Sequence, residues 1–345
     1  DTEDVENPVS AVIEEAAALG LVMGLLPTWG SLWKQNGDRS PIFDTENAFT
    51  YGRFLGQRYR DASLIWILGG DANIESDGER AVIDAMARGL RDGDEGTHLI
   101  TFHPRGPGQS SRKLHTAEWL DFNMNQSSHG ARDHDNGLFI EHDLALTPLK
   151  PTLDGEPRYE AIPVGFYNAD VRQAVRCDDY DMRQAAYWAL MAGACGHTYG
   201  NNSIWQMWAP GRRGVIGVTI PWYDALDHPG AFQMGIVRRL FESRPWQKLI
   251  PDSSFVVDGP THGGAKIRAA RADDHSFAFV YSPRGEPFTV RMNVIRGQTP
   301  PTRVPATWFD PRYGIATPLH TSDNSGFQTF VPPTSGRGQD WILVL

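Results

Sequence analysis

The sequence predicts an α/β protein in which parallel strand–helix units of barrel type are followed by an antiparallel β-sandwich. Up to about residue 245, helical patterns alternate with short apolar strands, and such alternation indicates parallel β–α units. From about residue 250, seven strand-like runs are separated by Gly, Pro, Asp and Ser, with no segment of helix length between them. This spacing is typical of a β-sandwich. We therefore predict two domains, residues 1–248 and 249–345.

The individual elements follow from apolar spacing and from the residues that end each run. The first helix ends at Gly20, a typical C-cap residue, and the second has Phe49, Leu55 and Tyr59 on one face. Predicted helices cover residues 5–20, 47–61, 79–94, 178–194 and 229–243. Predicted strands of the first domain cover residues 21–30, 63–71, 98–104, 119–130, 150–160 and 196–208. Predicted sandwich strands cover residues 253–259, 265–273, 276–283, 288–295, 305–314, 326–333 and 340–345.

The composition argues against two classes of partner. The net charge of −10 is unfavourable for binding a phosphate backbone, since nucleic-acid binders usually present a basic face. No window approaches the roughly 18 consecutive apolar residues of a membrane helix. The chain contains 11 tryptophans. Most are expected in the core, but several follow predicted strands, where a flat aromatic face can also stack on a sugar ring.

The two cysteines are not expected to form a disulfide. Cys177 and Cys195 flank one predicted helix, and about 18 helical residues span roughly 27 Å, far beyond the reach of a disulfide. We expect two buried thiols.

Polar and aromatic side chains follow each strand of the first domain, where a β/α barrel carries its active site. The strand "LIWILGGD" ends in two glycines and Asp71, and "KPTLDGEPRYE" contains Glu156. Two carboxylates from different strands are the equipment of glycoside hydrolysis, in which one protonates the leaving oxygen and the other attacks or activates water. The accompanying side chains at the strand ends are Trp29, His103, Gln126, His129, Tyr199 and Trp205.

Each of these residues also has a structural explanation. Asp71 can cap the following turn, Glu156 can be a turn residue beside a proline, and Glu160 competes with Glu156 on the same segment. The spacing of His129, His134 and the later histidines matches no standard set of metal ligands. We expect no metal and no cofactor.

Six motifs, in order, resemble the apiosidase-like glycoside hydrolases (glycoside hydrolase family 140, with a DUF4038 barrel). They are "GLLPTWG", "WILGGD", "FHPRGPGQSS", "WLDFNMNQSSHG", "KPTLDGEPRYE" and "ACGHTYGNNSIWQMW". The resemblance implies a (β/α)8 TIM-barrel of retaining type, with Asp71 as acid/base after the fourth strand and Glu156 as nucleophile after the seventh. The family pattern begins with two further strand–helix units before "GLLPTWG", so only six barrel strands are counted here. The later "PGAFQMGIVRRLFESRPWQKLIPD" and "WFDPRYG" resemble the end of that barrel and a C-terminal domain often labelled collagen-binding.

We therefore expect a retaining glycoside hydrolase acting on a plant or microbial polysaccharide, apiosidase-like or specific for a related furanoside. The alternatives are a catalytically inactive carbohydrate-binding protein and, less favoured, a metal-dependent barrel hydrolase. We expect the glycines before Asp71 to let the sugar approach the acid closely, and we expect a secreted or periplasmic location. The sequence leaves open the sugar, the linkage, the exo or endo mode and the oligomeric state. Expected sugar contacts are Trp29, His103, Gln126, His129, Tyr159, Tyr199 and Trp205.

Overall fold

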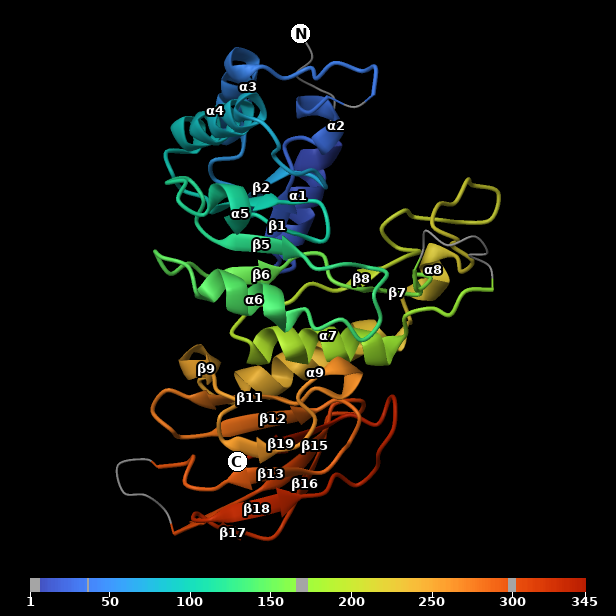
Figure 1. Cartoon of the computed structure of the whole chain (residues 1–345). Helices are drawn as coiled ribbons and strands as arrows, with labels where there is room; N and C mark the ends of the chain where they lie inside the picture. Colours follow the sequence, from blue (N-terminus) through green and yellow to red (C-terminus); the bar gives the residue numbers. More distant parts are fainter. Residues whose placement is uncertain (1–6, 36, 166–172, 297–301) are drawn as a thin grey trace. The chain divides into compact units, whose positions relative to one another are not determined.

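A computed structural model describes residues 7–35, 37–165, 173–296 and 302–345 (Figure 1). The chain divides into two compact units. Unit 1 comprises Asp1–Gln126 and Ala145–Thr152, and unit 2 comprises Ser127–Leu144 and Leu153–Leu345. Among the residues that the structure describes, no helix has the length and apolar character needed to cross a membrane.

Unit 1 is built on a three-stranded parallel sheet of order β1-β2-β3. The strands are β1 (Met23–Leu25), β2 (Leu64–Gly69) and β3 (Ile100–His103). The helices around them are α1 (Pro8–Ala18), α2 (Gly30–Trp33), α3 (Thr45–Arg58) and α4 (Asp77–Asp94). Capping boxes at Asp44 and Ser76 begin α3 and α4, and buried Trp66, Leu68 and Ile83 lie in the core. The three strand–helix alternations predicted here are confirmed.

A second sheet, of order β4-β5-β6, follows in the chain. Its strands are β4 (Gly108–Gln109), β5 (Asn123–Gln126) and β6 (Thr152–Asp154), and the short helix α5 (Ser111–Leu114) lies between β4 and β5 in sequence. The strand β4 pairs antiparallel with β5, which the sequence did not predict.

The first part of unit 2 contains the remaining helices and one parallel strand pair. The helices are α6 (Gly137–Leu144), α7 (Asp179–Met191), α8 (Trp222–Ala225) and α9 (Pro229–Glu242), and the parallel strands are β7 (Tyr159–Glu160) and β8 (Gly200–Asn201). The predicted helices at α7 and α9 are confirmed. Closure into an eight-stranded barrel stays a prediction.

The prediction for the cysteines is confirmed for one residue and wrong for the other. Cys177 is buried, and burial raises the pKa of its thiol to about 12. Cys195 is exposed, because it lies in the loop after α7 instead of on the buried helix. No disulfide joins the two.

The C-terminal part of unit 2 consists of antiparallel sheets, as the sequence predicted. The larger sheet has the order β16-β15-β19-β12-β11-β9, the smaller has the order β10-β13-β18, and β14 pairs with β17. The strands are β9 (Leu249–Pro251), β10 (Val256–Asp258), β11 (Arg268–Ala272), β12 (Ala278–Ser282), β13 (Phe288–Arg291), β14 (Arg303–Val304), β15 (Thr307–Asp310), β16 (Ile315–Pro318), β17 (Ser322–Asp323), β18 (Phe327–Phe330) and β19 (Trp341–Val344). Short 3-10 turns lie at Trp246–Lys248 and Gly263–Ala265.

The central strands of the six-stranded sheet, β12 and β19, are buried on both faces. On one face, Val280 and Leu343 share a core with Phe288 of the smaller sheet. On the other face, Phe279 and Ile342 pack in a cluster with side chains of α7 and α9. Because both faces are covered, every residue of β12 and β19 is buried, which is why these strands read as continuous apolar runs.

A buried ion pair also connects α7 with the last strands. The guanidinium of Arg183 donates two hydrogen bonds, of 3.2 and 2.7 Å, to Asp340 Oδ1, and both side chains are almost fully inaccessible to solvent. The same guanidinium bonds Asp179 and Gln233 at 2.7 and 2.6 Å. Removing one partner of such a pair leaves a buried charge uncompensated, so loss of either Arg183 or Asp340 would destabilise the packing of α7 on the sheet.

Candidate active site

Asp71 lies at the end of β2 on a backbone that only glycine adopts easily. Gly69, Gly70 and Asp71 have φ values of 91°, 80° and 52°, all in the left-handed region. A Cβ added at Gly70 would lie 2.9 Å from Trp29 Cα. A Cβ at Gly69 would lie 2.5 Å from the carbonyl oxygen of His103. Glycine is therefore needed at both positions because the neighbouring residues leave no room for a Cβ. The sequence analysis had instead expected these glycines to let a sugar approach Asp71.

Trp29, Asp71 and His103 come together at this strand end. The backbone N–H of Asp71 donates to His103 Nδ1 at 3.1 Å, so Nδ1 carries no proton and a neutral ring has its proton on Nε2. The ring centroids of Trp29 and His103 are 6.4 Å apart, and half of Trp29 is exposed. An indole face and an imidazole donor thus accompany the carboxylate.

Gln126 ends β5 as predicted, but it is buried. It pairs with Gly108 of β4, and a Cβ added at Gly106 would lie 2.8 Å from Gln126 Cγ. The 106–108 segment thus packs directly on this side chain, which holds the amide at the end of its strand.

Glu156 lies in unit 2, where two side chains donate to the same carboxylate oxygen. Tyr159 Oη donates to Glu156 Oε1 at 2.7 Å, and His129 Nε2 lies 2.8 Å from that atom. The rings of His129 and Tyr159 are stacked at a tilt, with centroids 4.3 Å apart. The three residues that the sequence predicted for the site, Glu156, His129 and Tyr159, are thus in direct contact. The sequence predicted His129 and Tyr159 as sugar contacts and did not indicate that they contact the carboxylate of Glu156.

The hydrogen bonds around His129 fix the number of protons in this group. His129 Nδ1 lies 2.8 Å from the carbonyl oxygen of Pro157, which only accepts, so Nδ1 carries a proton. A second proton must lie between Nε2 and Glu156 Oε1, because two lone pairs would otherwise face each other. The pair is therefore an imidazolium next to a carboxylate, or its tautomer with the proton on Glu156.

Glu160, the competing carboxylate, is held by hydrogen bonds from two distant parts of the chain. Its side chain accepts from Tyr199 Oη at 2.6 Å and from the backbone N–H of Gly230 at 3.2 Å. Gly230 lies in the first turn of α9, where a carboxylate is favoured by the helix dipole. Glu160 is 4% exposed, compared with 15% for the Glu156 side chain. Burial raises the pKa of the Glu160 carboxyl, and the bonds from Tyr199 and Gly230 offset this only in part.

Tyr199 and Trp205, which the sequence predicted as sugar contacts, have different partners in the structure. Tyr199 contacts Glu160, and its own pKa is raised by burial and by the bond to that carboxylate. Trp205 is 49% exposed on the segment after β8. Its indole Nε1 donates to Asn202 Oδ1 at 3.3 Å.

Asp154 is a polar residue that the sequence did not single out. It ends β6 and is fully buried, and its carboxylate accepts from Ser127 Oγ at 2.7 Å and from Asn136 Nδ2 at 2.8 Å. Burial raises the pKa of Asp154, while these donors lower it. These hydrogen bonds connect the segment that contains His129 with β6, the strand before Glu156. Asp154 therefore helps to position the residues around Glu156. Its place at the end of β6, two residues before Glu156, was the available signal.

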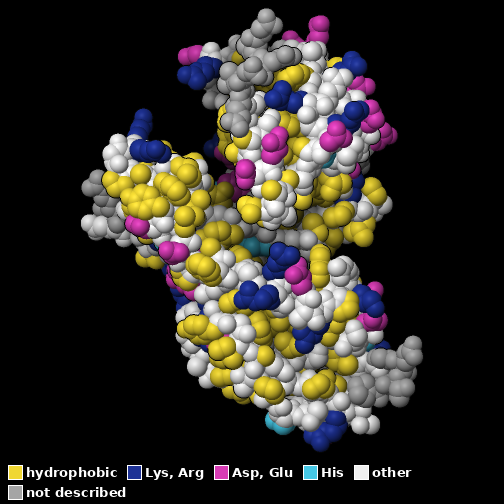
Figure 2. All heavy atoms as spheres, turned by 180° about the vertical axis from the view of Figure 1, so that it is seen from behind, with side chains coloured by type: hydrophobic (Ala, Val, Ile, Leu, Met, Phe, Trp, Pro, Cys, Tyr) yellow, Lys and Arg dark blue, Asp and Glu magenta, His cyan; other side chains and the backbone are white. Residues whose placement is uncertain are grey.

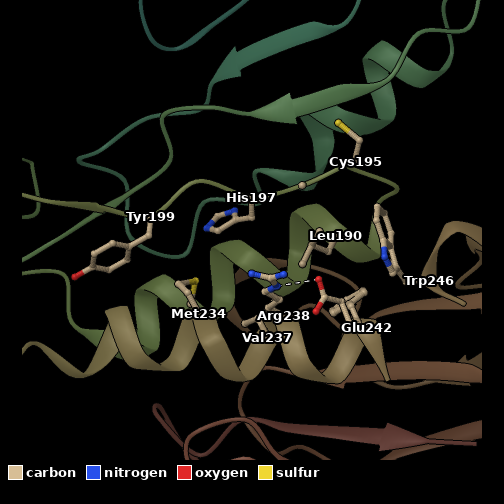
Figure 3. Close-up of a pocket in the computed structure, with 11 residues that line it drawn as sticks. Leu190, Cys195, His197, Tyr199, Met234, Val237, Arg238, Glu242 and Trp246 are labelled. Carbon is tan, nitrogen blue, oxygen red and sulfur yellow. Dashed lines mark hydrogen bonds and ion pairs between the residues drawn. The ribbon is translucent and has the colours of Figure 1, made fainter. Parts of the chain in front are cut away.

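An apolar pocket of about 330 Å³ lies between α9, the end of α7 and residues 195–199 (Figure 3). It includes Leu190, Met234 and Trp246, with the Arg238–Glu242 ion pair of 2.8 Å at its edge. Burial lowers the pKa of His197, which also lines the pocket, to about 3, so this imidazole is neutral. The pocket contains neither Asp71 nor Glu156.

The chain is similar to solved glycoside hydrolases. One, described as "Glycoside hydrolase", is 33% identical with a TM-score of 0.88, and the match covers 100% of this chain and 78% of that one. Another, a glycoside hydrolase family 5 structure from Bacteroides vulgatus ATCC 8482, is 30% identical with a TM-score of 0.88, covering 100% of this chain and 74% of that one. No curated protein sequence matches significantly. These structures define the class as glycoside hydrolase-like.

The family is shown by the sequence itself. Residues 7–248 match the family described as "Apiosidase-like, catalytic domain", and residues 250–345 match the one described as "Putative collagen-binding domain of a collagenase". The chain therefore belongs to the apiosidase-like glycoside hydrolases, as its motifs indicated. The structural division at residues 248 and 249 stays a prediction.

Proposed function

We propose that this protein is a retaining glycoside hydrolase that cleaves a glycosidic bond in a plant or microbial polysaccharide. The observation that carries the proposal is the environment of Glu156, whose Oε1 accepts from Tyr159 and lies against His129 Nε2. Two donors on one oxygen stabilise the ionised carboxylate and fix its orientation, as a nucleophile requires.

The reaction is a double displacement. Protonated Asp71 gives its proton to the glycosidic oxygen while the bond from that oxygen to the anomeric carbon breaks. Glu156 attacks the same carbon and forms a glycosyl ester. Asp71, now a carboxylate, takes a proton from water, whose oxygen displaces Glu156. In the form of the pair with the proton on His129, the imidazolium balances the negative charge of Glu156 before attack and after release.

The mechanism makes a geometric demand on the two acids. Retention requires carboxyl groups about 5–5.5 Å apart, whereas inversion requires roughly 6.5–9.5 Å. A crystal structure with a bound sugar tests this distance. Following the anomeric proton by NMR during hydrolysis tests the stereochemistry, and an inverted first product would overturn the retaining assignment.

The family supports an apiose-type or other furanoside substrate. Trp29 and His103 beside Asp71, and Trp205 after β8, supply the stacking and hydrogen-bonding groups for such a sugar. We also propose that the strand–helix units belong to a (β/α)8 barrel, and that the protein acts in a secreted or periplasmic location. The parallel order β1-β2-β3 supports the first of these proposals.

A glycan screen tests the function directly. Wild-type protein is incubated with pectic and furanoside-containing polysaccharides, with Glu156→Gln as the inactive control. Release of sugar by wild type alone supports the proposal. Binding of a glycan by both proteins without turnover would instead support the carbohydrate-binding alternative.

A further inference from the structure

Residues Ser127–Leu144, which we call the bridging segment, pack with the C-terminal sheets. The chain leaves unit 1 after Gln126 and returns to it at Ala145, so the bridging segment forms one compact unit with Leu153–Leu345. It begins with the loop that carries His129 and ends with α6. The segment lies in the part of the sequence that matches the catalytic domain. A catalytic loop is therefore in contact with the C-terminal part of the chain.

Acids of the bridging segment form ion pairs with bases on and just before β11. Asp135 pairs with Lys266 at 2.6 Å and with Arg268 at 2.8 Å. The side chains of Arg268 and Asp135 are 4% and 12% exposed, and the same guanidinium pairs with Glu141 at 2.5 Å. Burial raises the pKa of the Asp135 carboxyl, but the bonds from Arg268 and Lys266 outweigh this effect and lower the pKa below its usual value. Asp135 is therefore ionised at neutral pH.

These pairs differ from the charges on the surface of the molecule. Figure 2 shows Lys, Arg, Asp and Glu side chains scattered over one face, and exposed ion pairs contribute little because water and salt screen them. A largely buried pair depends on both partners, because loss of one leaves the other charge uncompensated. A Cβ added at Gly137 would lie 2.5 Å from Arg268 Cζ, so this guanidinium packs directly on the backbone of the bridging segment.

A second connection runs through Asp133, four residues after His129. Asp133 has a left-handed backbone, with φ 59°. Its Oδ2 accepts from Arg284 Nη2 at 2.8 Å, and its Oδ1 accepts from Gln184 Nε2 at 3.2 Å. Gln184 is buried on α7 and also donates to the carbonyl of Gly264 at 3.0 Å. Since Arg284 lies between β12 and β13, Asp133 is bonded to the C-terminal sheets.

Gln184 also connects the bridging segment with the loop of Glu156. Its Oε1 accepts from Arg158 Nη1 at 2.6 Å, and Arg158 Nη2 donates to the carbonyl of His134 at 2.6 Å. Arg158 is buried and follows Glu156 by two residues. The segments that carry His129 and Glu156 are thus bonded to one buried amide, whose other partners include the turn before β11.

We propose that the C-terminal sheets have a positioning role in catalysis, in which Arg284, through Asp133, holds His129 in the orientation that shares a proton with Glu156. Catalytic groups need neighbours that fix their orientation. Arg284 and Asp133 act through His129, so they are positioning residues. The inference rests on the proposed function for the statement that this orientation matters for hydrolysis. The orientation itself can be measured without turnover.

The test removes the charge of one partner and leaves the backbone unchanged. Asp133→Asn keeps the left-handed conformation, which Asn adopts readily, and keeps the acceptor for Gln184, but removes the charge that Arg284 contacts. We expect kcat to fall about threefold to tenfold with KM unchanged, less than the roughly 10²-fold cost of a misplacement of about 1 Å, because this pair is partly exposed.

Variants of Arg284 test whether the effect belongs to this pair. Arg284→Gln should lower kcat as much as Asp133→Asn, and Arg284→Lys, which keeps the charge, should restore most of the loss. The double variant Asp133→Asn, Arg284→Gln should lose no more than either single variant, since both changes remove one interaction.

NMR of the protein with 15N-labelled histidine measures the orientation of His129 without substrate. In the wild type, the proton between His129 Nε2 and Glu156 Oε1 should give a signal that exchanges slowly with water. Its absence in His129→Gln assigns it. Asp133→Asn and Arg284→Gln should shift this signal and accelerate its exchange.

Arg271→Gln is the matched control. Arg271 lies on β11, three residues after Arg268, and pairs with Asp252 at 2.7 Å, with both side chains 19% exposed. Asp252 directly follows β9, so this pair lies within the C-terminal sheets. Urea denaturation should show a loss of stability similar to that of Arg284→Gln, while kcat and the His129 signal keep their wild-type values.

Three outcomes would overturn the inference. They are wild-type kcat together with a wild-type His129 signal in Asp133→Asn, equal losses of kcat in Arg271→Gln and Arg284→Gln, and a loss that appears only in KM. Failure of wild-type protein to hydrolyse any glycan would defeat the proposed function. The His129 signal in the variants would then by itself support or overturn the positioning role.

Discussion

Asp71 and Glu156 are positioned in opposite ways. Asp71 follows two left-handed glycines and is itself left-handed, and its backbone N–H is bound by His103. Glu156 is held through its side chain, by Tyr159 and His129. One carboxylate is placed by backbone conformation and the other by hydrogen bonds to its own oxygen.

This difference predicts which substitutions the surroundings of Asp71 and those of Glu156 tolerate. Backbone strain of the kind at Asp71 persists only where the surroundings determine it, and it is common at active sites. A side-chain network tolerates backbone adjustment but depends on every donor. Substitutions should therefore damage the Asp71 end through neighbouring glycines and the Glu156 end through neighbouring side chains.

The largest expected effect comes from Glu156→Gln. Loss of the nucleophile should lower kcat by about 10⁴-fold or more, comparable with removal of catalytic nucleophiles elsewhere. The measurement is the initial rate on the glycan found in the screen. Residual activity above one-tenth of wild type would show that another group attacks.

Asp71→Asn should have the second largest effect. General acid–base catalysis contributes about 10²–10⁴-fold, and the loss should shrink for a substrate whose leaving group needs no proton. Kinetics on aryl glycosides with leaving groups of different acidity provide the comparison. The same loss for good and poor leaving groups would contradict the acid role.

Gly70→Ala tests the backbone side of the comparison. The added Cβ would meet Trp29 at 2.9 Å on a left-handed residue, so we expect about 1–3 kcal/mol of lost stability and about 10²-fold lower activity from misplacement of Asp71. Urea denaturation and kcat are measured together.

Gly96→Ala is the matched control for this change. Gly96 is also left-handed, with φ 74°, but no atom lies within 4 Å of an added Cβ. It should cost about 1 kcal/mol of stability with unchanged kcat. Equal effects at Gly70 and Gly96 would show that the contact with Trp29 is unimportant.

Tyr159→Phe tests the side-chain end. The hydrogen bond to a charged group is worth about 1.5–3 kcal/mol, so kcat/KM should fall about 10–150-fold with little change in stability.

His129→Gln should in addition alter the alkaline limb of the pH profile of kcat/KM, because the proton shared with Glu156 is removed. An unchanged profile would contradict the shared proton.

Glu160→Gln should have the smallest effect on activity. Its raised pKa means that the folded state holds a proton which the unfolded state releases above about pH 4.5. The free energy of unfolding of the wild type should therefore fall as pH rises from 4.5 through the raised value, and the variant should lack this decline. Thermal unfolding across this pH range measures it. Loss of activity as large as that of Glu156→Gln would reassign the nucleophile.

Much of the fold was predictable from local patterns. The helices α3, α4, α7 and α9 have clear apolar spacing and, for three of them, capping boxes, and all seven predicted sandwich runs contain strands. The strands β9, β14, β16 and β17 lie outside the predicted runs. For β14 and β17 the reason is length, since pairs as short as Arg303–Val304 have no periodicity to read. Two-residue strands exist only because a distant segment offers a partner.

The sequence by itself indicated the family and the order of the main helices and strands, and it predicts Asp71 and Glu156 as the catalytic carboxylates, because these features are encoded in contiguous motifs. Tertiary structure decided what each side chain contacts. Glu160 accepts hydrogen bonds from Tyr199 and Gly230, which are 39 and 70 residues away in the sequence. A hydrogen bond between such distant residues depends on how α9 and β8 pack against β7, and no local pattern carries that information.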